Sequence, residues 1–263
     1  MKILVFIKET PETVAVVQPT SDGSDLDRSS WKYIVNPYDD FAIEEALKLK
    51  QEAGSGEIVV ATIAPESAKE RLLKPLAMGA DRALLVNNQG FESADSLQTS
   101  LVLAKIAESE KPDIIFCGQQ GIDGNDMHVP TMVAEHLNLP HVNAVCEVKV
   151  ADSKAEVKRE IEGGQVEVYD VQLPAVFGAS KSLNSPRYAS VPGIMKARKK
   201  PMDKKTIADL GIDVANLGAS NKAVIKGYEA PPEKPEGQLF QGEETNTMVS
   251  KVVDLLFDEA KVL

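Results

Sequence analysis

A glycine-rich segment is the part of this sequence whose residue types and spacing best suit ligand chemistry. Gly118, Gly121 and Gly124 recur at every third position of GQQGIDGND, which directly follows the apolar run IIFC. Glycine allows the backbone to approach a ligand closely, and free N–H groups at the start of a following helix can hold a phosphate. The spacing matches neither GxGxxG nor GxxxxGKS, so a nucleotide site and an ordinary strand-to-helix turn both remain open.

A second candidate lies in NPYDDFAIEEA, at the start of a predicted helix over residues 39–52. Pro37 would fix the direction in which the chain enters the helix, and the Asn36 amide could bind a base or a ribose. A rigid helix entry without a ligand explains the same residues equally well. Asp39 and Asp40 are expected to cap free N–H groups of the first turn and to oppose the helix dipole.

The third candidate is LNSPRYASVPGIMKARKKP, residues 183–201. Prolines stiffen it, and Val191, Ile194 and Met195 give it apolar side chains. A cationic stretch follows, made of Lys196, Arg198, Lys199, Lys200, Lys204 and Lys205. Apolar residues beside charges are typical of contact surfaces, because burial supplies affinity and charge steers the encounter. A buried irregular segment is the competing interpretation.

No set of residues indicates a catalytic or metal site. The sequence has three histidines: His128 lies in the glycine-rich segment, while His136 and His141 flank a Leu-Pro turn, so no base with an orienting partner can be assigned. Cys117 and Cys146 lie in predicted strands without metal-ligand spacing. We expect free thiols and therefore a reducing compartment, the cytoplasm.

Composition narrows the class of protein. The 263 residues are 43% apolar, enough for one large packed domain, and the net charge is −11. That charge argues against a general nucleic-acid binder, which needs clustered cations facing phosphates. No apolar run is long enough to insert into a membrane, and MKILVFIKET is interpreted as a first strand rather than a signal peptide.

The elements that must position these candidates form an α/β pattern up to about residue 145. Short apolar runs alternate with helical periodicity, which predicts a mostly parallel sheet wrapped by helices, a Rossmann-like fold that binds nucleotides at its edge. The predicted strands are residues 2–8, 57–64, 82–86 and 113–118, and the predicted helices are residues 39–52, 67–78, 96–110 and 127–137. On the first helix, Glu44 and Glu45 are expected to face solvent.

After Leu139 the pattern changes to strand-like alternation over residues 144–150, 155–161, 166–171 and 175–178. Gly163 and Gly164 predict a turn, and the group is interpreted as an antiparallel extension of the sheet. Prolines from residue 186 onward predict an extended C-terminal arm. Helical spacing returns at 245–263, and that helix is expected to pack on its own domain or on a partner. We therefore expect an α/β domain at 1–182 and the recognition segment, arm and helix at 183–263.

Together these segments resemble the beta subunit of electron transfer flavoproteins over nearly the whole chain. The most specific part is REIEGGQVEVYDVQLPAV followed by LNSPRYASVPGIMKARKKP, which is similar to the family's Glu-Gly-Gly turn, its Leu-Pro strand and its Pro-Arg-Tyr-Ala run. NPYDDFAIEEALKLK and AMGADRALLV are also characteristic of the family.

The resemblance implies an electron carrier rather than an enzyme. Such a beta subunit pairs with an alpha subunit, helps enclose an electron-carrying FAD and buries AMP. It carries electrons from flavin dehydrogenases, such as acyl-CoA dehydrogenase, towards a quinone-linked oxidoreductase. Carried across by position, the cofactor-binding residues would be Phe6, Asn36, Pro37, Tyr38, Asp39, Ile63, Gly118, Gln119, Gln120, Gly121, Ile122, Asp123, Gly124, Asn125, Asp126, Met127, His128 and Val129. The segment that recognises the dehydrogenase would be Ala189, Ser190, Val191, Pro192, Gly193, Ile194 and Met195, with Val191 as its apolar anchor.

Two alternatives to an AMP-binding carrier remain. Some relatives hold a second FAD in place of AMP and oxidise NADH; their loop reads Asp-Gly-Asp-Thr, whereas this chain continues from Asp123 and Gly124 to Asn125 and Asp126. Asp126 would also put a carboxylate near a phosphate unless it points away or caps the helix. The second alternative is a stand-alone adenine-nucleotide enzyme, which should have a Ser-Gly-Gly-type loop after the first strand, where this chain has KETP.

Overall fold

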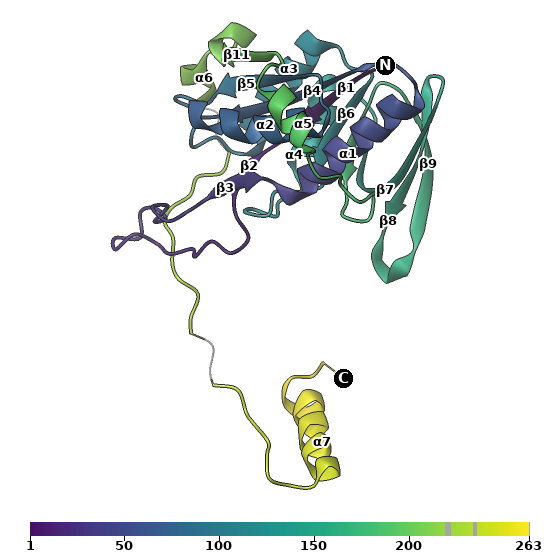
Figure 1. The fold of residues 1–263 in the computed structure, drawn as a ribbon. Coiled ribbons are helices and arrows are strands. Elements are labelled where there is room, and N and C mark those ends of the chain that lie inside the picture. Colours follow the sequence, from purple (N-terminus) through teal and green to yellow (C-terminus); the bar gives the residue numbers. More distant parts are fainter. Residues whose placement is uncertain (219–221, 234–235, 263) are drawn as a thin grey trace.

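A mixed sheet with helices on both faces makes up most of this computed structural model, which describes residues 1–218, 222–233 and 236–262 (Figure 1). Within these residues one nine-stranded sheet has the order β11-β5-β4-β1-β6-β10-β7-β8-β9, and β2 and β3 form a separate ribbon. The strands are β1 (Lys2–Phe6), β2 (Glu9–Pro11), β3 (Tyr33–Val35), β4 (Glu57–Ala64), β5 (Arg82–Asn87), β6 (Ile114–Gly118), β7 (His141–Ala151), β8 (Lys154–Glu160), β9 (Val166–Gln172), β10 (Ala175–Ala179) and β11 (Met202–Thr206).

Helices connect the parallel strands: α1 (Pro37–Glu52), α2 (Lys69–Met78), α3 (Ser96–Glu110), α4 (Val129–Leu137) and α5 (Val191–Ala197). Two more helices, α6 (Val214–Gly218) and α7 (Thr245–Asp254), follow β11. Short 3₁₀ turns occur at Glu66–Ala68, Glu162–Gly164 and Ala208–Leu210, and a π-helical turn at Leu255–Glu259 follows α7. None of the helices within the described residues combines the length and apolar character needed to cross a bilayer.

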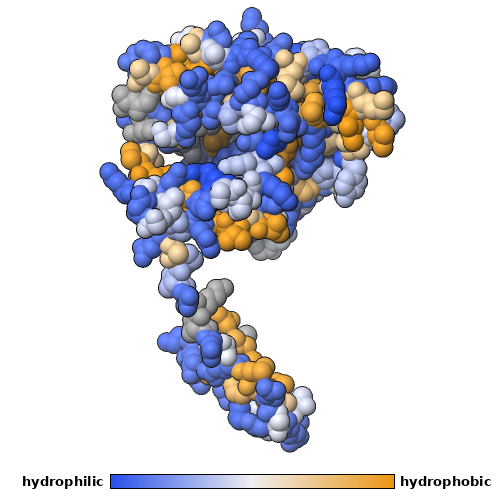
Figure 2. All heavy atoms as spheres, turned by 60° about the vertical axis from the view of Figure 1, so that its left-hand side comes forward, coloured by the Kyte–Doolittle hydropathy of each residue, from blue (hydrophilic) through white to orange (hydrophobic). Residues whose placement is uncertain are grey.

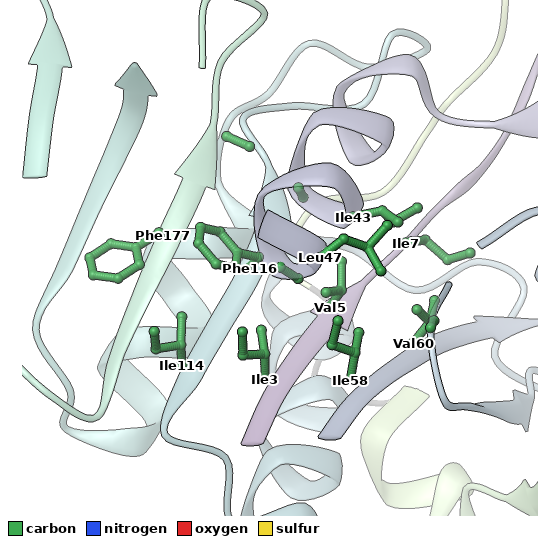
Figure 3. Close-up of a cluster of buried hydrophobic side chains, with 14 of the residues drawn as sticks. Ile3, Val5, Ile7, Ile43, Leu47, Ile58, Val60, Ile114, Phe116 and Phe177 are labelled. Carbon is green, nitrogen blue, oxygen red and sulfur yellow. The ribbon is translucent and has the colours of Figure 1, made fainter. Parts of the chain in front are cut away.

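The core explains why the parallel strands are continuously apolar. Ile3 and Val5 of β1 pack under Ile43 and Leu47 of α1 (Figure 3). Leu4, between them in sequence, belongs to the opposite cluster beneath α3 and α4. Because successive side chains of a strand point to opposite faces, covering both faces requires an unbroken apolar run. The predicted α/β fold with a mostly parallel sheet is confirmed.

The order in which strands are added to the sheet changes side at β1. From β1 the chain continues to β4 and β5 on one side, and β6 then lies on the other side of β1. In open parallel sheets this reversal opens a crevice at the carboxyl ends of the two central strands, where ligands bind. The glycine-rich segment follows β6 at that crevice.

The antiparallel extension is confirmed in part. Strands β7, β8 and β9 are antiparallel neighbours, and Gly163 and Gly164 turn the chain between β8 and β9 with φ of 75° and 71°. The prediction that residues 175–178 belong to this antiparallel extension is wrong. They form β10, which lies inside the sheet and runs parallel to both β6 and β7. All five residues of β10 are buried, which is typical of a strand covered on both faces.

The chain does not leave the domain at residue 183. Leu183 and Ala197 are buried, α5 packs against α2, and β11 extends the sheet as a parallel neighbour of β5. The predicted extended arm therefore does not begin at residue 183 but lies C-terminal to α6. The expected division of the chain into domains 1–182 and 183–263 stays a prediction. The arm passes the loop at Gly23, whose carbonyl accepts from the Tyr228 N–H at 2.8 Å, and ends in α7, which stands away from the sheet (Figure 1).

Candidate functional site

Asp39, in the first turn of α1, joins the two strands that flank the crevice. One carboxylate oxygen accepts from the Lys8 N–H at 2.6 Å, just beyond β1. The other accepts from the Gly118 N–H at 3.1 Å, at the end of β6, and from the Asn36 side-chain amide at 2.9 Å. The predicted capping role for Asp39 is wrong: its side chain turns toward the sheet instead of accepting from the helix's own N–H groups, and α1 has no side-chain cap.

Asn36 continues this network into the glycine-rich segment. Its amide nitrogen donates to the Gln120 carbonyl at 2.9 Å as well as to Asp39, and its amide oxygen accepts from the Ile122 N–H at 3.1 Å. The residue is 1% exposed, so both ends of its amide are engaged within the protein. Asn36 therefore positions the backbone of the loop rather than presenting a free amide to a base.

Glycine at position 118 follows from the same packing. A Cβ there would lie 2.3 Å from an Asp39 carboxylate oxygen and 2.8 Å from the Tyr38 Cβ. Such distances are far below contact, so only glycine lets β6 end against α1. This places Tyr38 directly beside the loop.

Burial sets the ionisation of the groups behind the loop. Loss of solvation raises the pKa of Asp39 to about 7, against the effect of its three N–H donors, which favour the carboxylate. Burial and the nearby Asp39 charge raise the pKa of the Cys117 thiol well above its ordinary value. Because thiolates rather than thiols react, Cys117 is an inert core residue.

The second half of the loop is exposed and differently built. Asn125 and Met127 have φ of 54° and 58°, the left-handed region. When residues alternate between right-handed and left-handed backbone conformations, their successive N–H groups point into a shared concavity that can bind an anion. Within the described residues, the N–H groups of residues 126–129 have no hydrogen-bond partner, and the N-cap of α4 is His128 without a side-chain cap. Asp126 is exposed and does not cap α4.

Lys8 is the residue of this site that the sequence pattern did not single out. Its ammonium group lies 2.7 Å from an Asp123 carboxylate oxygen and so places a cation beside the loop. The signal available in the sequence was a single charged residue ending the run ILVFI, at the carboxyl end of a predicted strand.

The remaining predicted cofactor residues border the same edge. Pro37 is the first residue of α1. Phe6 ends β1 and is buried in the cluster under α3 and α4, and Ile63 lies near the end of the neighbouring β4 and is half-buried. The structure thus gathers the ends of β1, β4 and β6 with the start of α1. Within the described residues, no group of three metal-binding side chains occurs.

Most of the predicted recognition segment lies in the short helix α5, which packs against α2. Ser190 caps α5 by accepting from the Gly193 N–H at 3.1 Å. Val191, Ile194 and Met195 are exposed, at 73%, 51% and 71%. The competing interpretation of a buried irregular segment is therefore wrong.

Glu44 and Glu45 of α1 are buried rather than solvated. Glu44 accepts from the Arg187 side chain at 2.8 Å through both carboxylate oxygens, and this hydrogen bond raises the pKa of Arg187. Glu45 accepts from the Asn184 amide at 2.9 Å, and burial raises the pKa of Glu45. The predicted solvent-facing role is wrong because the chain at residues 184–187 returns to cover this face of α1.

The sequence matches a known protein family. A family model described as electron transfer flavoprotein domain matches residues 25–210. Electron transfer flavoprotein subunit beta of Methylophilus methylotrophus is 33% identical over 259 residues, 97% of this chain and 98% of that protein. The same subunit of Bacillus subtilis is 35% identical over 264 residues, covering both chains fully. The caffeyl-CoA reductase-Etf complex subunit CarD of Acetobacterium woodii is 38% identical over 259 residues, 97% of this chain and 98% of that protein.

Proposed function

The chain belongs to the electron transfer flavoprotein family as a beta subunit, and we propose that it binds AMP at the carboxyl edge of its sheet while helping to position an electron-carrying FAD. Proteins of this family are flavin-associated electron carriers rather than enzymes. The beta subunit pairs with an alpha subunit and carries electrons from dehydrogenases.

The observation that carries the AMP proposal is the loop fixed by Asn36 and Asp39. Their hydrogen bonds hold the backbone of residues 118–122 at the crevice beside β1. Beyond them, the N–H groups of residues 126–129 have no partner within the described residues. The Lys8 ammonium lies at the same edge, paired with the Asp123 carboxylate of the loop. A nucleotide monophosphate suits such a site, because its phosphate would accept from backbone N–H groups near the start of α4.

The flavin supplies the redox chemistry, and the share of this chain is orientation. FAD accepts and donates electrons, so the protein around it has to position the ring and shield it from water. In this proposal the chain positions and shields the flavin ring jointly with the alpha subunit. The donors would be flavin dehydrogenases such as acyl-CoA dehydrogenase, and the acceptor a quinone-linked oxidoreductase.

The C-terminal helix fits the role of an attachment to the alpha subunit. Along α7 and the turn after it, Val249, Val252, Val253, Leu256 and Phe257 recur at spacings of three and four residues and are 36% to 63% exposed. Orange apolar side chains along this helix are visible in Figure 2. An unburied apolar stripe of this kind favours packing on another subunit.

The alternative function is the variant with a second FAD in place of AMP, which oxidises NADH. Asp123 and Gly124, which this chain shares with that type of loop, favour it.

Counting bound nucleotides separates the two functions. The chain is co-expressed with its alpha subunit, the purified heterodimer is denatured, and the released FAD and AMP are quantified by chromatography. Equal amounts of FAD, AMP and heterodimer support the carrier with AMP. Two FAD per heterodimer, without AMP, would replace it by the NADH-oxidising variant. One FAD with no second nucleotide would overturn both.

A further inference from the structure

The proposed docking surface extends beyond the seven residues that the sequence singled out. We use this name for the exposed side chains of residues 188–195. Tyr188 is 98% exposed, more than Val191 or Met195, and it directly precedes the predicted segment. A tyrosine can bury 150–250 Å², roughly, and its ring has few rotatable bonds, so interfaces favour it.

This surface lies on a helix that is too short to hold itself. α5 has seven residues, and isolated helices below roughly 12 residues are marginal in water. Its position must therefore come from contacts with the rest of the domain.

One of these contacts, between Glu44 and Arg187, holds the chain just before α5. Glu44 accepts from the Arg187 side-chain nitrogens Nε and Nη2, both at 2.8 Å, and from the Arg187 backbone N–H at 3.1 Å. The Glu44 side chain is 7% exposed and the Arg187 side chain is 40% exposed, so a buried carboxylate holds a guanidinium that is partly open to solvent. A bidentate pair with an added backbone bond fixes direction as well as distance. It therefore fixes the main chain immediately before Tyr188.

Two further contacts fix the other end of the segment. The Lys200 ammonium donates to the Leu76 and Ala80 carbonyls at 2.9 and 2.6 Å, at the end of α2. Within α5, a Cβ on Gly193 would lie 2.4 Å from the Ala77 carbonyl oxygen, so helix and helix are in direct backbone contact. The segment is thus fixed on both sides of its exposed residues.

We infer that Glu44 and Arg187 are positioning residues for the docking of an electron-donating dehydrogenase, and that Tyr188 is a further contact residue of that surface. The inference rests on the proposed function, an electron carrier for dehydrogenases, and on the expectation from the family resemblance that residues 189–195 recognise the dehydrogenase. A pre-ordered surface loses less conformational entropy when a partner binds. An ion pair whose cation is partly exposed adds little net stability, so geometry is the property it supplies here.

The partner's chemistry follows from charge. The docking surface continues into exposed Lys196, Arg198 and Lys199, in a chain whose net charge is −11. A partner that meets this surface should carry an apolar pocket bordered by acidic residues.

The test uses the heterodimer with its alpha subunit and a purified acyl-CoA dehydrogenase as electron donor. Glu44→Gln and Arg187→Gln are expected to raise KM for the heterodimer about tenfold, because several side chains must then be ordered on binding. The equilibrium Kd measured without turnover should rise equally, while kcat and flavin content stay unchanged. Tyr188→Ala should raise KM and Kd several-fold. Asp40 lies on the same helix as Glu44 and forms an ion pair with Lys74 of α2. The control Asp40→Asn removes this pair and should change neither constant.

The outcomes separate this inference from the proposed docking function through Val191→Ala. If Val191→Ala raises KM but Glu44→Gln and Arg187→Gln do not, the positioning role is overturned and the docking site stands. If none of these variants changes KM, the docking site itself is overturned. Parallel loss of flavin, kcat and stability in the two Gln variants would mean that the pair is merely structural. Unchanged KM and Kd in Tyr188→Ala would remove Tyr188 from the surface.

Discussion

The glycine-rich loop and the proposed docking surface are held from the same helix in opposite ways. The start of α1 fixes the loop from within, through Asp39 and Asn36, whose polar atoms are buried and fully engaged. The middle of α1 fixes the docking surface from behind, through Glu44, and leaves Tyr188 and Val191 exposed.

This difference separates folding from recognition. Removing a buried group that several backbone N–H groups depend on leaves those donors unpaired and changes the stability of the whole domain. Removing an exposed side chain changes little besides binding. Substitutions in the two regions should therefore have effects on different measurements.

Asp39→Ala should have the largest effect on stability. It leaves the Lys8 N–H, the Gly118 N–H and the Asn36 amide without an acceptor, which costs about 3 kcal/mol or more. Urea unfolding measures the loss, with Asp40→Asn as a control on the adjacent residue. A change below 1 kcal/mol, roughly, would mean that water replaces the carboxylate and that the loop is not fixed from within.

Gly193→Ala tests whether the docking surface is as independent of the fold as its exposure indicates. The new Cβ would lie 2.4 Å from the Ala77 carbonyl oxygen, and moving α5 away should cost about 1–3 kcal/mol. KM for the dehydrogenase should rise as well, because α5 carries Val191 and Met195. The control is Gly237→Ala, where a Cβ meets no atom within 4 Å. Unchanged stability in Gly193→Ala would show that α5 shifts without strain.

The sheet illustrates which parts of the fold could be predicted from sequence. Strands β1, β4, β5 and β6 were predicted because a strand covered on both faces must be apolar throughout, a local property. β10 was assigned the wrong direction because the partner of a strand is set by the path of the chain. β11, with the sequence MDKKT, has no apolar pattern at all, since it is an edge strand whose charged side chains suit that place.

The site shows the same limit. Glycine spacing and Asn36-Pro37 indicated the two segments that meet at the crevice of the sheet, because turns and helix starts have local signatures. The roles of Asn36 and Asp39 depend on β1 and β6 being neighbours, which no local pattern contains. Glu44 was placed in solvent because its partner Arg187 lies 143 residues away in the chain.

The pH dependence of stability tests the role of the buried Asp39 through a smaller effect than its removal. Burial raises the pKa of Asp39 from 3.8 to about 7, so between these values the folded protein retains a proton that the unfolded chain releases. The contribution of Asp39 to stability should therefore be largest below about pH 4 and fall as pH rises toward 7. The difference in unfolding free energy between the native chain and Asp39→Asn isolates this group. Parallel profiles of the two proteins would show that the pKa of Asp39 is the same in the folded and unfolded chains.

The smallest effect on stability, and the clearest test of the exposed side, concerns the cations beside the docking surface. Arg198→Gln and Lys199→Gln should change stability by less than about 0.5 kcal/mol, since both side chains are exposed. The association rate with the dehydrogenase should fall a few-fold at low ionic strength and approach that of the native heterodimer in concentrated salt, because screening removes steering. The control Lys32→Gln changes the net charge equally at an exposed site on another part of the chain. A loss of rate that persists in salt would instead assign these side chains to direct packing, and the docking surface would then extend past residue 195 into the basic stretch.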